Sequence, residues 1–275
     1  MKFLEGLDND IKISLLKQIR DLWTHTSTAI EGNTLTLGET AFVIEEGLTI
    51  KGKPLRDHNE VRGHARAIEI IYRLMEKTRI DTEDVFDLHT AVQVEDVLDV
   101  LRPAGKWKTE PNGTYAVIDE KQVFIEYAAP QDVPALMERW IGLFNEAISR
   151  PPSDGECHIS YAKLHVSFVQ IHPFSDGNGR MARLLANGPV IKAGYPPIVI
   201  PVEERQTYIS LLASYRAGTG SLTARDIKLV AEESEAFGKF AEFCAVCRDS
   251  LMELVKRARE VQGERNAYRM DRPGK

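Results

Sequence analysis

The stretch HPFSDGNGRMAR, residues 172–183, gathers reactive side chains in a way that a buried core segment does not. It holds an imidazole, a carboxylate, an amide and two guanidinium groups within twelve residues. Because Pro173 disfavours the α conformation at the residue before it, a helix that arrives from upstream should end at His172. Gly177-Asn178-Gly179 stands where the next helix should begin. We therefore predict a loop between two helices, with a chemical function.

The start of that second helix is suited to binding a polyphosphate. Free backbone N–H groups and the positive end of the helix dipole meet there, and glycines let a phosphate approach the backbone closely. Arg180 and Arg183 are expected on one side of the first turn, where they can grip further anionic oxygens. Asp176 is the type of single carboxylate that holds Mg²⁺ while phosphates supply other ligands. His172, with an ordinary pKa of about 6.5, is a candidate general base.

Two other kinds of loop with similar residues do not fit. In a calcium-binding loop aligned on the Asp-Gly-Asn-Gly segment, the first and last positions would be Phe174 and Leu185, so both required carboxylates are missing. A P-loop is excluded because G-x-x-x-x-G-K-[ST] does not occur in the sequence. Attack on a nucleotide phosphate is the chemistry that these side chains fit best.

The composition is that of a globular protein. The 275 residues are 43% hydrophobic and 28% charged, and the formal net charge of −6 argues against the broad basic surface of a nucleic-acid-binding protein. The three cysteines, Cys157, Cys244 and Cys247, are too few for a disulfide framework and odd in number. The N-terminus shows no apolar signal region, and no apolar run reaches the roughly 20 residues of a membrane helix. We expect a cytoplasmic protein without nucleic-acid or membrane partners.

Hydrophobic periodicity near 3.6 residues predicts a mostly α-helical bundle. Thr36 and Glu39 have the spacing of a capping box, which should open a short helix that ends at Gly47. The final residues have almost no apolar content and are expected to form a flexible tail. The expected helices cover residues 11–31, 36–47, 57–77, 132–148, 158–171, 179–193 and 203–215, followed by a long charged helix that ends near residue 261.

Residues 113–127 change to an alternating pattern. Hydrophobic residues alternate with others on both sides of a polar tip, Asp119-Glu120-Lys121. Such alternation is typical of a β-hairpin, although the tip lacks the strongest turn dipeptides. The alternating residues are Tyr115, Val117, Val123, Ile125 and Tyr127.

The stretch HPFSDGNGRMAR resembles the Fic-domain signature H-x-F-x-[DE]-G-N-G-R-x-x-R at every specified position. The segments AGYPPIVIPVEERQTYISLL, DHNEV and AIEII are similar to the family as well. The resemblance implies a Fic fold, a helical bundle with a β-hairpin flap and here an extra C-terminal helix. The chain divides into an N-terminal region (1–55) with an inhibitory helix over about 11–31, a Fic catalytic core (56–232), a C-terminal helix (233–262) and the tail (263–275).

Fic proteins mostly transfer AMP from ATP to a Ser, Thr or Tyr hydroxyl of a target protein and release pyrophosphate. The resemblance therefore implies a nucleotidyltransferase with ATP and Mg²⁺ as cofactors. By the same likeness His172 is the general base and Asp176 holds the Mg²⁺. The remaining signature residues would bind phosphates: Gly177, Asn178 and Gly179 cradle them, and Arg180 and Arg183 bind the β and γ groups.

The hairpin is similar in position to the family's flap, which pairs with an extended segment of the target as an added strand. Val123, Phe124 and Ile125 are the flap residues expected near the nucleotide. Tyr208, placed 36 residues after His172, matches a family tyrosine near the adenine. The asparagine that often follows this tyrosine in the family is replaced here by Tyr215-Arg216-Ala217.

A second resemblance concerns regulation. Residues 27–32, STAIEG, resemble the family's inhibitory motif [ST]-x-x-x-E-[GN], which in one class precedes the catalytic signature as it does here. Ser27 and Glu31 are four residues apart and share a helix face, so the hydroxyl can support the carboxylate. The likeness implies that Glu31 pairs with Arg183, occupies the place of the γ-phosphate and forces ATP into an unproductive pose.

Other functions stay open at this point. The same site could remove AMP from modified proteins with Glu31 positioning water, or transfer a γ-phosphate as Doc-type kinases of this fold do. A non-enzymatic alternative is a nucleotide-sensing partner of a DNA-binding protein or antitoxin, although residues 232–261 read as one helix without the strand pair of a winged helix. A homodimer is also compatible with the family.

Overall fold

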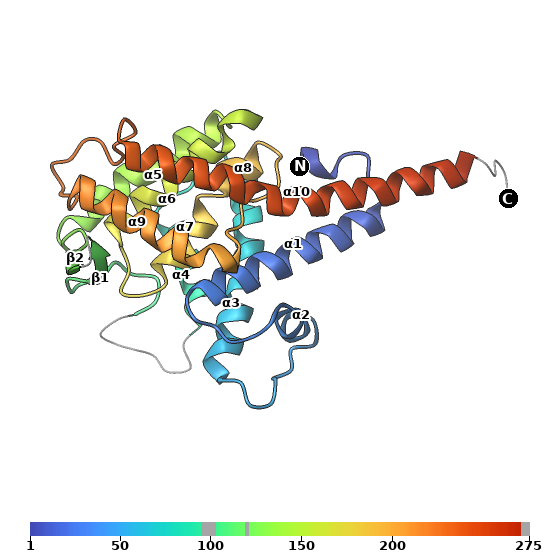
Figure 1. Cartoon of the computed structure of the whole chain (residues 1–275), viewed down its shortest axis with the longest axis horizontal. Coiled ribbons are helices and arrows are strands. Elements are labelled where there is room, and N and C mark those ends of the chain that lie inside the picture. The colour runs from blue at the N-terminus through green and yellow to red at the C-terminus, as the bar shows by residue number, and fades with distance from the viewer. Residues whose placement is uncertain (95–102, 119–120, 271–275) are drawn as a thin grey trace.

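The computed structural model describes residues 1–94, 103–118 and 121–270, which form a mostly helical molecule with a hairpin at one end (Figure 1). This confirms the predicted fold class. The α-helices of the described residues are α1 (Asn9–Ile30), α2 (Leu37–Glu46), α3 (Leu55–Leu74), α4 (Thr82–Val92), α5 (Val133–Ser149), α6 (Cys157–Ile171), α7 (Asn178–Leu185), α8 (Gly188–Lys192), α9 (Arg205–Thr219) and α10 (Glu235–Met270). The strands are β1 (Gly113–Ile118) and β2 (Lys121–Glu126), and short 3-10 helices cover Lys2–Leu4, Asp154–Glu156 and Val202–Glu204.

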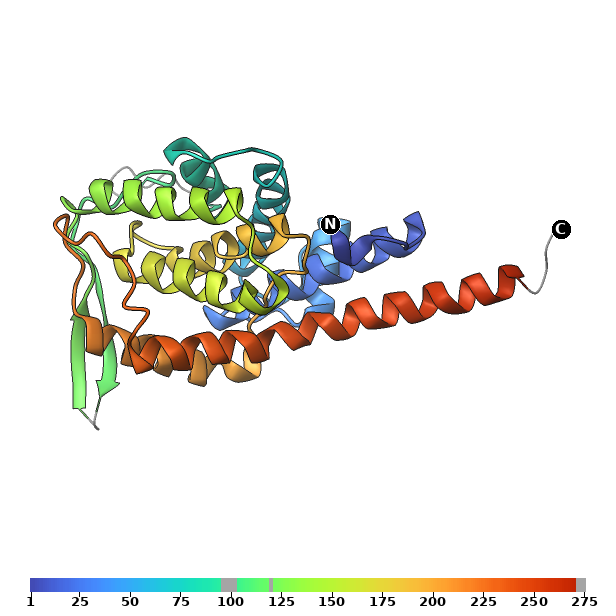
Figure 2. The ribbon, with the colours of Figure 1, turned by 90° about the horizontal axis from the view of Figure 1, so that it is seen from above.

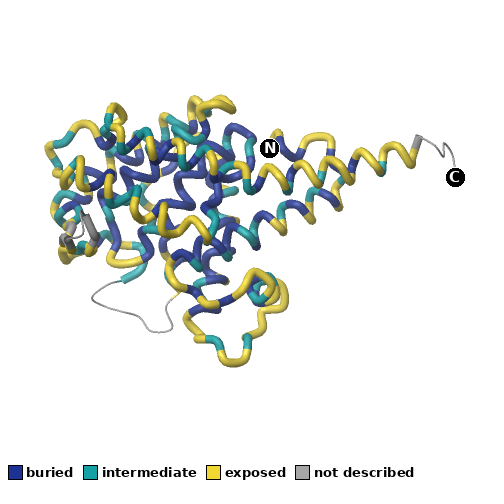
Figure 3. The backbone as a smooth tube through the Cα atoms, in the orientation of Figure 1, coloured by how far each residue is buried: buried dark blue, intermediate teal, exposed yellow. Residues whose placement is uncertain are grey.

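Helix α6 forms the centre of the bundle. It packs against α5, α7, α8 and α10, and apolar side chains occupy most of its circumference, as expected of a helix that is covered on all sides. The indole of Trp140 on α5 is fully buried and donates a hydrogen bond to the backbone oxygen of Leu164, 3.1 Å away. Figure 3 shows this buried interior and the exposed outer surfaces. The end of α6 at residue 171 is therefore held rigidly, and the catalytic loop follows it directly.

Helices α1 and α10 lie side by side along one flank, and α10 continues beyond the body of the molecule (Figures 1 and 2). The sequence placed residues 263–275 in a tail, but α10 extends to Met270. Ion pairs explain the added turns, because Arg265 lies 3.0 Å from Asp8 and 2.7 Å from Asp10 at the start of α1. Periodicity alone does not detect contacts of this kind. None of the helices within the described ranges is long and apolar enough to cross a membrane.

The helix predicted over residues 179–193 is divided into α7 and α8. Asn187 separates them with a fully buried side chain that accepts from the backbone N–H of Ile198 at 2.6 Å and donates to its oxygen at 2.9 Å. The same amide donates to the backbone oxygen of Arg183 at 3.0 Å. Pro189, which cannot donate a helical hydrogen bond, lies in the first turn of α8. The side chain of Asn187 thus connects α7, the helix of the signature, to the extended segment at residue 198.

Two capping boxes define the starts of α-helices. The one predicted at Thr36 and Glu39 is present at the start of α2, which ends before Gly47 in a left-handed conformation. A second joins Asp81 and Asp84 at the start of α4, a helix that we did not predict. The D-x-x-D spacing at residues 81–84 was the sequence signal for the start of α4. The helix ends at Val92, and α4 packs against α7.

The predicted hairpin is present, with β1 and β2 antiparallel and in register from Gly113 opposite Glu126 to Ile118 opposite Lys121. Residues 119 and 120 of the expected tip lie outside the described residues. Figure 2 shows the hairpin at the end of the molecule opposite the C-terminus.

Candidate active site

The loop that begins at His172 has a backbone conformation that few side chains adopt. His172 has φ 50° and ψ 59°, and it is the one non-glycine residue with positive φ among the described residues. Its N–H still donates to the backbone oxygen of Phe168 at 2.9 Å, so it caps α6. Two residues later, Phe174 is fully buried and stacks on His89 with ring centroids 3.7 Å apart. The left-handed cap and the buried anchor together turn the chain sharply after α6.

The imidazole of His172 has the tautomer and the charge state that allow it to accept a proton. Its ring lies parallel to that of Tyr127 at 3.8 Å, and its Nδ1 lies 3.3 Å from the backbone oxygen of Val169. That oxygen can only accept, so Nδ1 carries the hydrogen and Nε2 keeps its lone pair. Burial, and next the charge of Lys108, lower the pKa of His172 to about 3. The ring is therefore neutral at pH 7, as a general base must be.

Asn178 holds the loop together. Its side chain is buried, its Oδ1 accepts from the N–H of Phe174 at 2.9 Å, and its Nδ2 donates to the oxygen of the same residue at 2.8 Å. Both functional atoms of this amide bind within the loop, but Nδ2 keeps a second N–H, so the expectation that Asn178 cradles phosphates stays a prediction. Gly177, with φ 75°, precedes the helix whose first backbone N–H groups were expected to bind phosphates.

Asp176 presents a carboxylate to solvent, with 76% of the side chain exposed. One oxygen accepts from the N–H of Gly177 at 2.7 Å, and the other lies 3.6 Å from Arg180 and accepts from Gln93 at 3.3 Å. Neighbouring protein partly desolvates the exposed carboxyl, which opposes its charge, but Arg180 and the Gly177 N–H outweigh that effect and lower its pKa. Within the described ranges no cluster of three ionisable ligands could hold a metal ion by itself. A single exposed carboxylate fits Mg²⁺ that takes its other ligands from phosphates and water.

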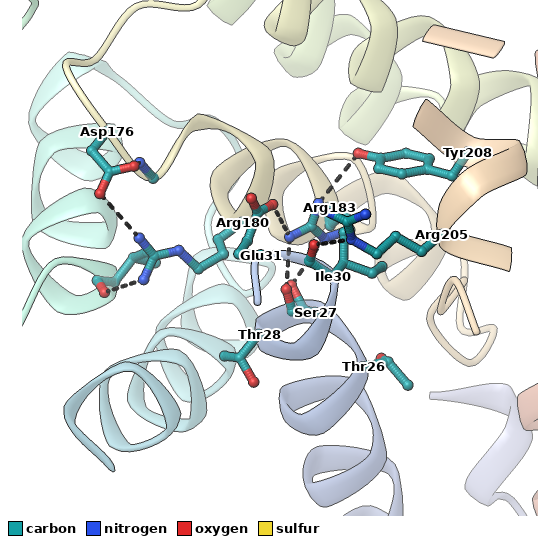
Figure 4. A network of polar contacts seen from close by, with 12 residues as sticks. Thr26, Ser27, Thr28, Ile30, Glu31, Asp176, Arg180, Arg183, Arg205 and Tyr208 are labelled. Atoms are coloured by element: carbon teal, nitrogen blue, oxygen red, sulfur yellow. Dashed lines mark hydrogen bonds and ion pairs between the residues drawn. The ribbon is translucent and has the colours of Figure 1, made fainter. Parts of the chain in front are cut away.

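The two signature arginines point in different directions, contrary to the expectation that both face one ligand (Figure 4). Arg180 reaches the end of α4, where it donates to the side chain of Gln93 at 2.7 Å and lies near Asp176. Arg183 turns toward α1 and α9. Positions three apart differ by about 60° around a helix axis, which is enough to separate two long side chains. Arg183 lines a cavity beside this loop, and Arg180 does not.

Arg183 is buried and bound by α1. Its Nη2 donates to Oε1 of Glu31 at 2.7 Å and to the backbone oxygen of Ser27 at 2.8 Å, and its Nε donates to Oγ of Ser27 at 3.0 Å. The predicted pair of Glu31 and Arg183 is thus present. The hydroxyl of Ser27 holds the guanidinium, however, and not the carboxylate as we expected. Nη1 of Arg183 also contacts the hydroxyl of Tyr208 at 3.3 Å.

The Glu31 carboxylate lies against the start of α7. A Cβ added to Gly179 would meet Oε1 of Glu31 at 2.4 Å, so a side chain there would collide with the carboxylate. An anionic group therefore already stands at a helix N-terminus flanked by an arginine, which is the place the sequence assigned to a phosphate.

A cavity of about 460 Å³ opens beside these residues. Its size is in the usual range for small-molecule sites. Thr114 and Tyr115 of β1 line it, whereas Phe124 of β2 does not and is 54% exposed. The side chains of Val123 and Ile125 lie outside the described part of the hairpin. The residues that line the cavity and were expected from the sequence are Glu31, His172, Gly179, Arg183 and Tyr208.

Sequence reasoning missed several residues around this cavity. Arg205 lines the cavity and donates from Nε to the backbone oxygen of Ile30 at 2.6 Å, which caps α1. Arg216 also lines the cavity and lies with its guanidinium carbon 5.7 Å from the ring centre of Tyr127. Both are arginines on α9, and their positive charge is the one feature of the sequence that could have indicated a role beside an anionic ligand.

The helical bundle, the loop after His172 and the hairpin beside it define a Fic-type domain. Residues 79–188 match the family model described as Fic/DOC family. Residues 79–188 therefore form a Fic/DOC-family domain, which confirms the resemblance found in the signature. The matched range is narrower than the core of 56–232 predicted from the sequence.

Solved structures share the whole fold. A Fic-domain-containing signalling protein from Bacteroides thetaiotaomicron has a TM-score of 0.80 and 27% identity, with 94% of each chain covered. Fic-1 from Caenorhabditis elegans has a TM-score of 0.71 and 26% identity, with 94% of this chain and 69% of that one covered.

Curated relatives are named protein adenylyltransferases. The one from Drosophila virilis is 32% identical over 230 residues, and fic-1 from Caenorhabditis elegans is 31% identical over 227 residues. These matches cover 83% and 81% of this chain, and 41% of each relative. The chain thus spans less than half the length of these relatives.

Proposed function

We propose that this chain is an autoinhibited protein adenylyltransferase that transfers AMP from ATP to a Ser, Thr or Tyr hydroxyl of a target protein. The names of its relatives and the neutral imidazole of His172 support the transfer reaction. The observation that carries the proposal is the position of the Glu31 carboxylate between Gly179 and Arg183. An inhibitory group that imitates a phosphate belongs in a nucleotide-dependent site.

In the proposed reaction the target hydroxyl oxygen attacks the α-phosphorus of ATP. The bond from that phosphorus to the bridging oxygen of the β-phosphate breaks, and pyrophosphate leaves with the bond's electron pair. The hydroxyl proton passes to Nε2 of His172, whose Nδ1–H stays on the backbone oxygen of Val169. The flanking cavity holds the nucleotide, so most of the catalytic effect comes from positioning and charge stabilisation.

Asp176 is the residue that would hold Mg²⁺. Its carboxylate is exposed and is kept ionised by Arg180 and the N–H of Gly177. The bound ion would neutralise charge on the phosphates. Arg180 itself is buried against the end of α4, so its role is to orient Asp176 through Gln93 and the ion pair.

Inhibition would act through competition for Arg183. The pair with Glu31 must break before a γ-phosphate can take the carboxylate's place. A hydrogen bond to a charged group contributes roughly 1.5–3 kcal/mol, and the lower value applies because the Glu31 side chain is 40% exposed. About 1.4 kcal/mol corresponds to tenfold in rate, so release of Glu31 should raise activity by at least about tenfold.

The hairpin would present the target. An exposed strand edge can add an extended segment of another protein through backbone hydrogen bonds, which selects accessible backbone more than sequence. Tyr115 of β1 lines the cavity, so the added segment would pass close to His172.

The reaction is tested with purified protein, Mg²⁺ and ATP labelled at either the α- or the γ-phosphate. In the Glu31→Gly background we expect α-label on protein and none from γ-label. His172→Ala in the same background should reduce α-label at least about a hundredfold, since general bases contribute about 10²–10⁴ in rate. Label from the γ-position would instead support a Doc-like phosphotransferase. Loss of AMP from a modified protein without its addition would support the reverse reaction.

A further inference from the structure

Lys108 is a buried cation that the proposed reaction does not use. The residue is 3% exposed and lies in the segment that leads into the hairpin. Its Nζ donates to Oδ1 of Asn112 at 2.5 Å and lies 3.5 Å from the backbone oxygen of Ile171. Both acceptors are neutral, and Lys108 forms no ion pair with any acidic side chain of the described residues. Glu126 is near enough to stabilise its charge, but a buried ammonium group without a contacting carboxylate is unfavourable, so its presence calls for a role.

The contacts of Lys108 and Asn112 lie on both sides of His172. The backbone N–H of Lys108 donates to the oxygen of Pro173 at 2.8 Å. Nδ2 of Asn112 donates to the oxygen of Phe174 at 3.0 Å. Together with the contact at residue 171, these hydrogen bonds reach the backbone directly before His172 and the two residues directly after it. They hold a turn whose central residue has an unfavourable left-handed conformation.

Asn112 also fixes the ring that covers the base. Its backbone oxygen accepts from the N–H of Tyr127 at 3.0 Å. The Tyr127 ring lies at 3.8 Å from that of His172, with an angle of 2° between the planes. Movement of Asn112 would therefore shift both the loop that carries His172 and the ring packed on it.

Charge adds to this effect. Burial, and next the nearby Arg216, lower the pKa of Lys108 to about 8, so most of the amine is still protonated at pH 7. The charged groups that act on His172 are Lys108, Arg216 and Asp176, and the Tyr127 ring covers one face. The cationic neighbours favour the neutral imidazole that accepts a proton.

We propose that Lys108 and Asn112 form a bracket that positions His172 for proton transfer and links its loop to the base of the hairpin. Lys108 is a positioning residue, because it does not line the nucleotide cavity. The proposal rests on the proposed function for its kinetic consequence, but the geometry of the bracket can be measured without any activity.

The kinetic test uses the full chain with Glu31→Gly as the parent. Lys108→Met should lower kcat at least tenfold and leave the KM for ATP within about twofold, because the loss concerns the base and not nucleotide binding. Lys108→Arg, which keeps a cation and donors, should recover part of the loss. Lys106→Met removes an exposed lysine two residues away and should match the parent. A change in the KM for ATP with kcat unchanged in Lys108→Met would overturn the proposal. Kinetic constants equal to those of the parent would overturn it as well.

A spectroscopic test separates this proposal from the proposed function. The ring proton signals of His172, assigned by their loss in His172→Ala, should move in Lys108→Met and in Asn112→Ala because the stacking on Tyr127 changes. The signals of buried His165 should stay in place and report an intact core. If the parent transfers no AMP, the proposed function fails while this test still decides the bracket. Unchanged His172 signals in a folded variant would contradict the proposed bracket. If Lys108→Met does not fold, Asn112→Ala is the variant that decides the test.

Discussion

At the scale of single residues, Gly179 marks the closest approach between the inhibitory helix and the signature helix. A Cβ at this position would lie 2.4 Å from Oε1 of Glu31 and 3.1 Å from Nη1 of Arg183. The carboxylate is the end of a flexible side chain, so what resists its displacement is the ion pair with Arg183. Gly179 is needed here for space, and its stability effect should depend on Glu31.

We expect Gly179→Ala to lower the free energy of unfolding by about 1–3 kcal/mol, the usual cost of overpacking. In the Glu31→Gly background the cost should fall by at least about 0.5 kcal/mol, because the obstacle is absent. Urea unfolding of the four proteins measures this coupling. Gly142→Ala is the control, since its Cβ would meet nothing within 4 Å on α5 and should stabilise the helix by about 0.8 kcal/mol. If the effects of Gly179→Ala and Glu31→Gly on the free energy of unfolding were additive, the contact between the two residues would be contradicted.

The signature predicted which residues gather at this loop, and the inhibitory motif predicted the pair of Glu31 and Arg183, but the other contacts were not predictable. His172, Asp176 and Arg183 lie around the predicted loop because the sequence order alone places them at a helix junction. The partners of Asn178 and Arg180 depend on Phe174 and on the end of α4, which the local pattern does not contain. The spacing of residues in the sequence does not tell whether a polar side chain binds within the loop or binds a ligand.

At the scale of elements, the junction of α7 and α8 connects the signature helix to the rest of the bundle. Asn187→Ala would leave the backbone N–H and oxygen of Ile198 and the oxygen of Arg183 without their buried partner. We expect the free energy of unfolding to fall by at least about 2 kcal/mol. Asn9→Ala at the exposed first position of α1 is the control, with an expected change within about 0.5 kcal/mol. Equal unfolding midpoints in urea for the two variants would refute this role.

The elements themselves were largely predictable where the apolar period is strong. Helices such as α5 and α6 follow the expected ranges closely because one hydrophobic pattern covers each of them. The division of α7 from α8 comes from a buried side chain, and the added turns of α10 come from Arg265 and Asp8. The first contact joins residues 11 apart and the second joins residues 257 apart, and the hydrophobic period of a single helix reports neither.

At the scale of the whole molecule, buried histidines make stability sensitive to acid. Burial lowers the pKa of His165 to about 3 and that of His89 to about 4, whereas both are near 6.5 in an unfolded chain. Between these values the unfolded chain binds more protons, so stability is fully present above about pH 6.5 and is lost as the pH falls toward 3–4. Each such histidine should contribute about 1.4 kcal/mol per pH unit within this window.

This pH dependence is measured by urea unfolding at pH 7, 6 and 5. His165→Gln should reduce the change in unfolding free energy between pH 6 and 5 by about one histidine's contribution. His158→Gln replaces a partly exposed histidine at the start of α6 and is the matched control. The interpretation fails if both variants show the same pH dependence as the parent.

The contacts that were hardest to predict from the sequence join helices far apart in the chain. Glu31 and Arg183 are 152 residues apart, and their contact requires α1 to pack across the end of α7. The motif resemblance predicted the pair, but no local rule predicts that Ser27 would bind the guanidinium or that Arg205 would cap α1. Such contacts follow from how whole helices are placed by the core.

The most direct test of the central claim compares AMP transfer by the wild type and by Glu31→Gly. Equal amounts of each protein are incubated with Mg²⁺ and α-labelled ATP, and label on protein is measured over time. Glu233→Gly, which removes an exposed acid of the same charge, is the control. We predict at least about tenfold faster labelling by Glu31→Gly and wild-type rates for the control. Equal labelling by all three proteins would contradict the proposal that Glu31 inhibits the site through Arg183.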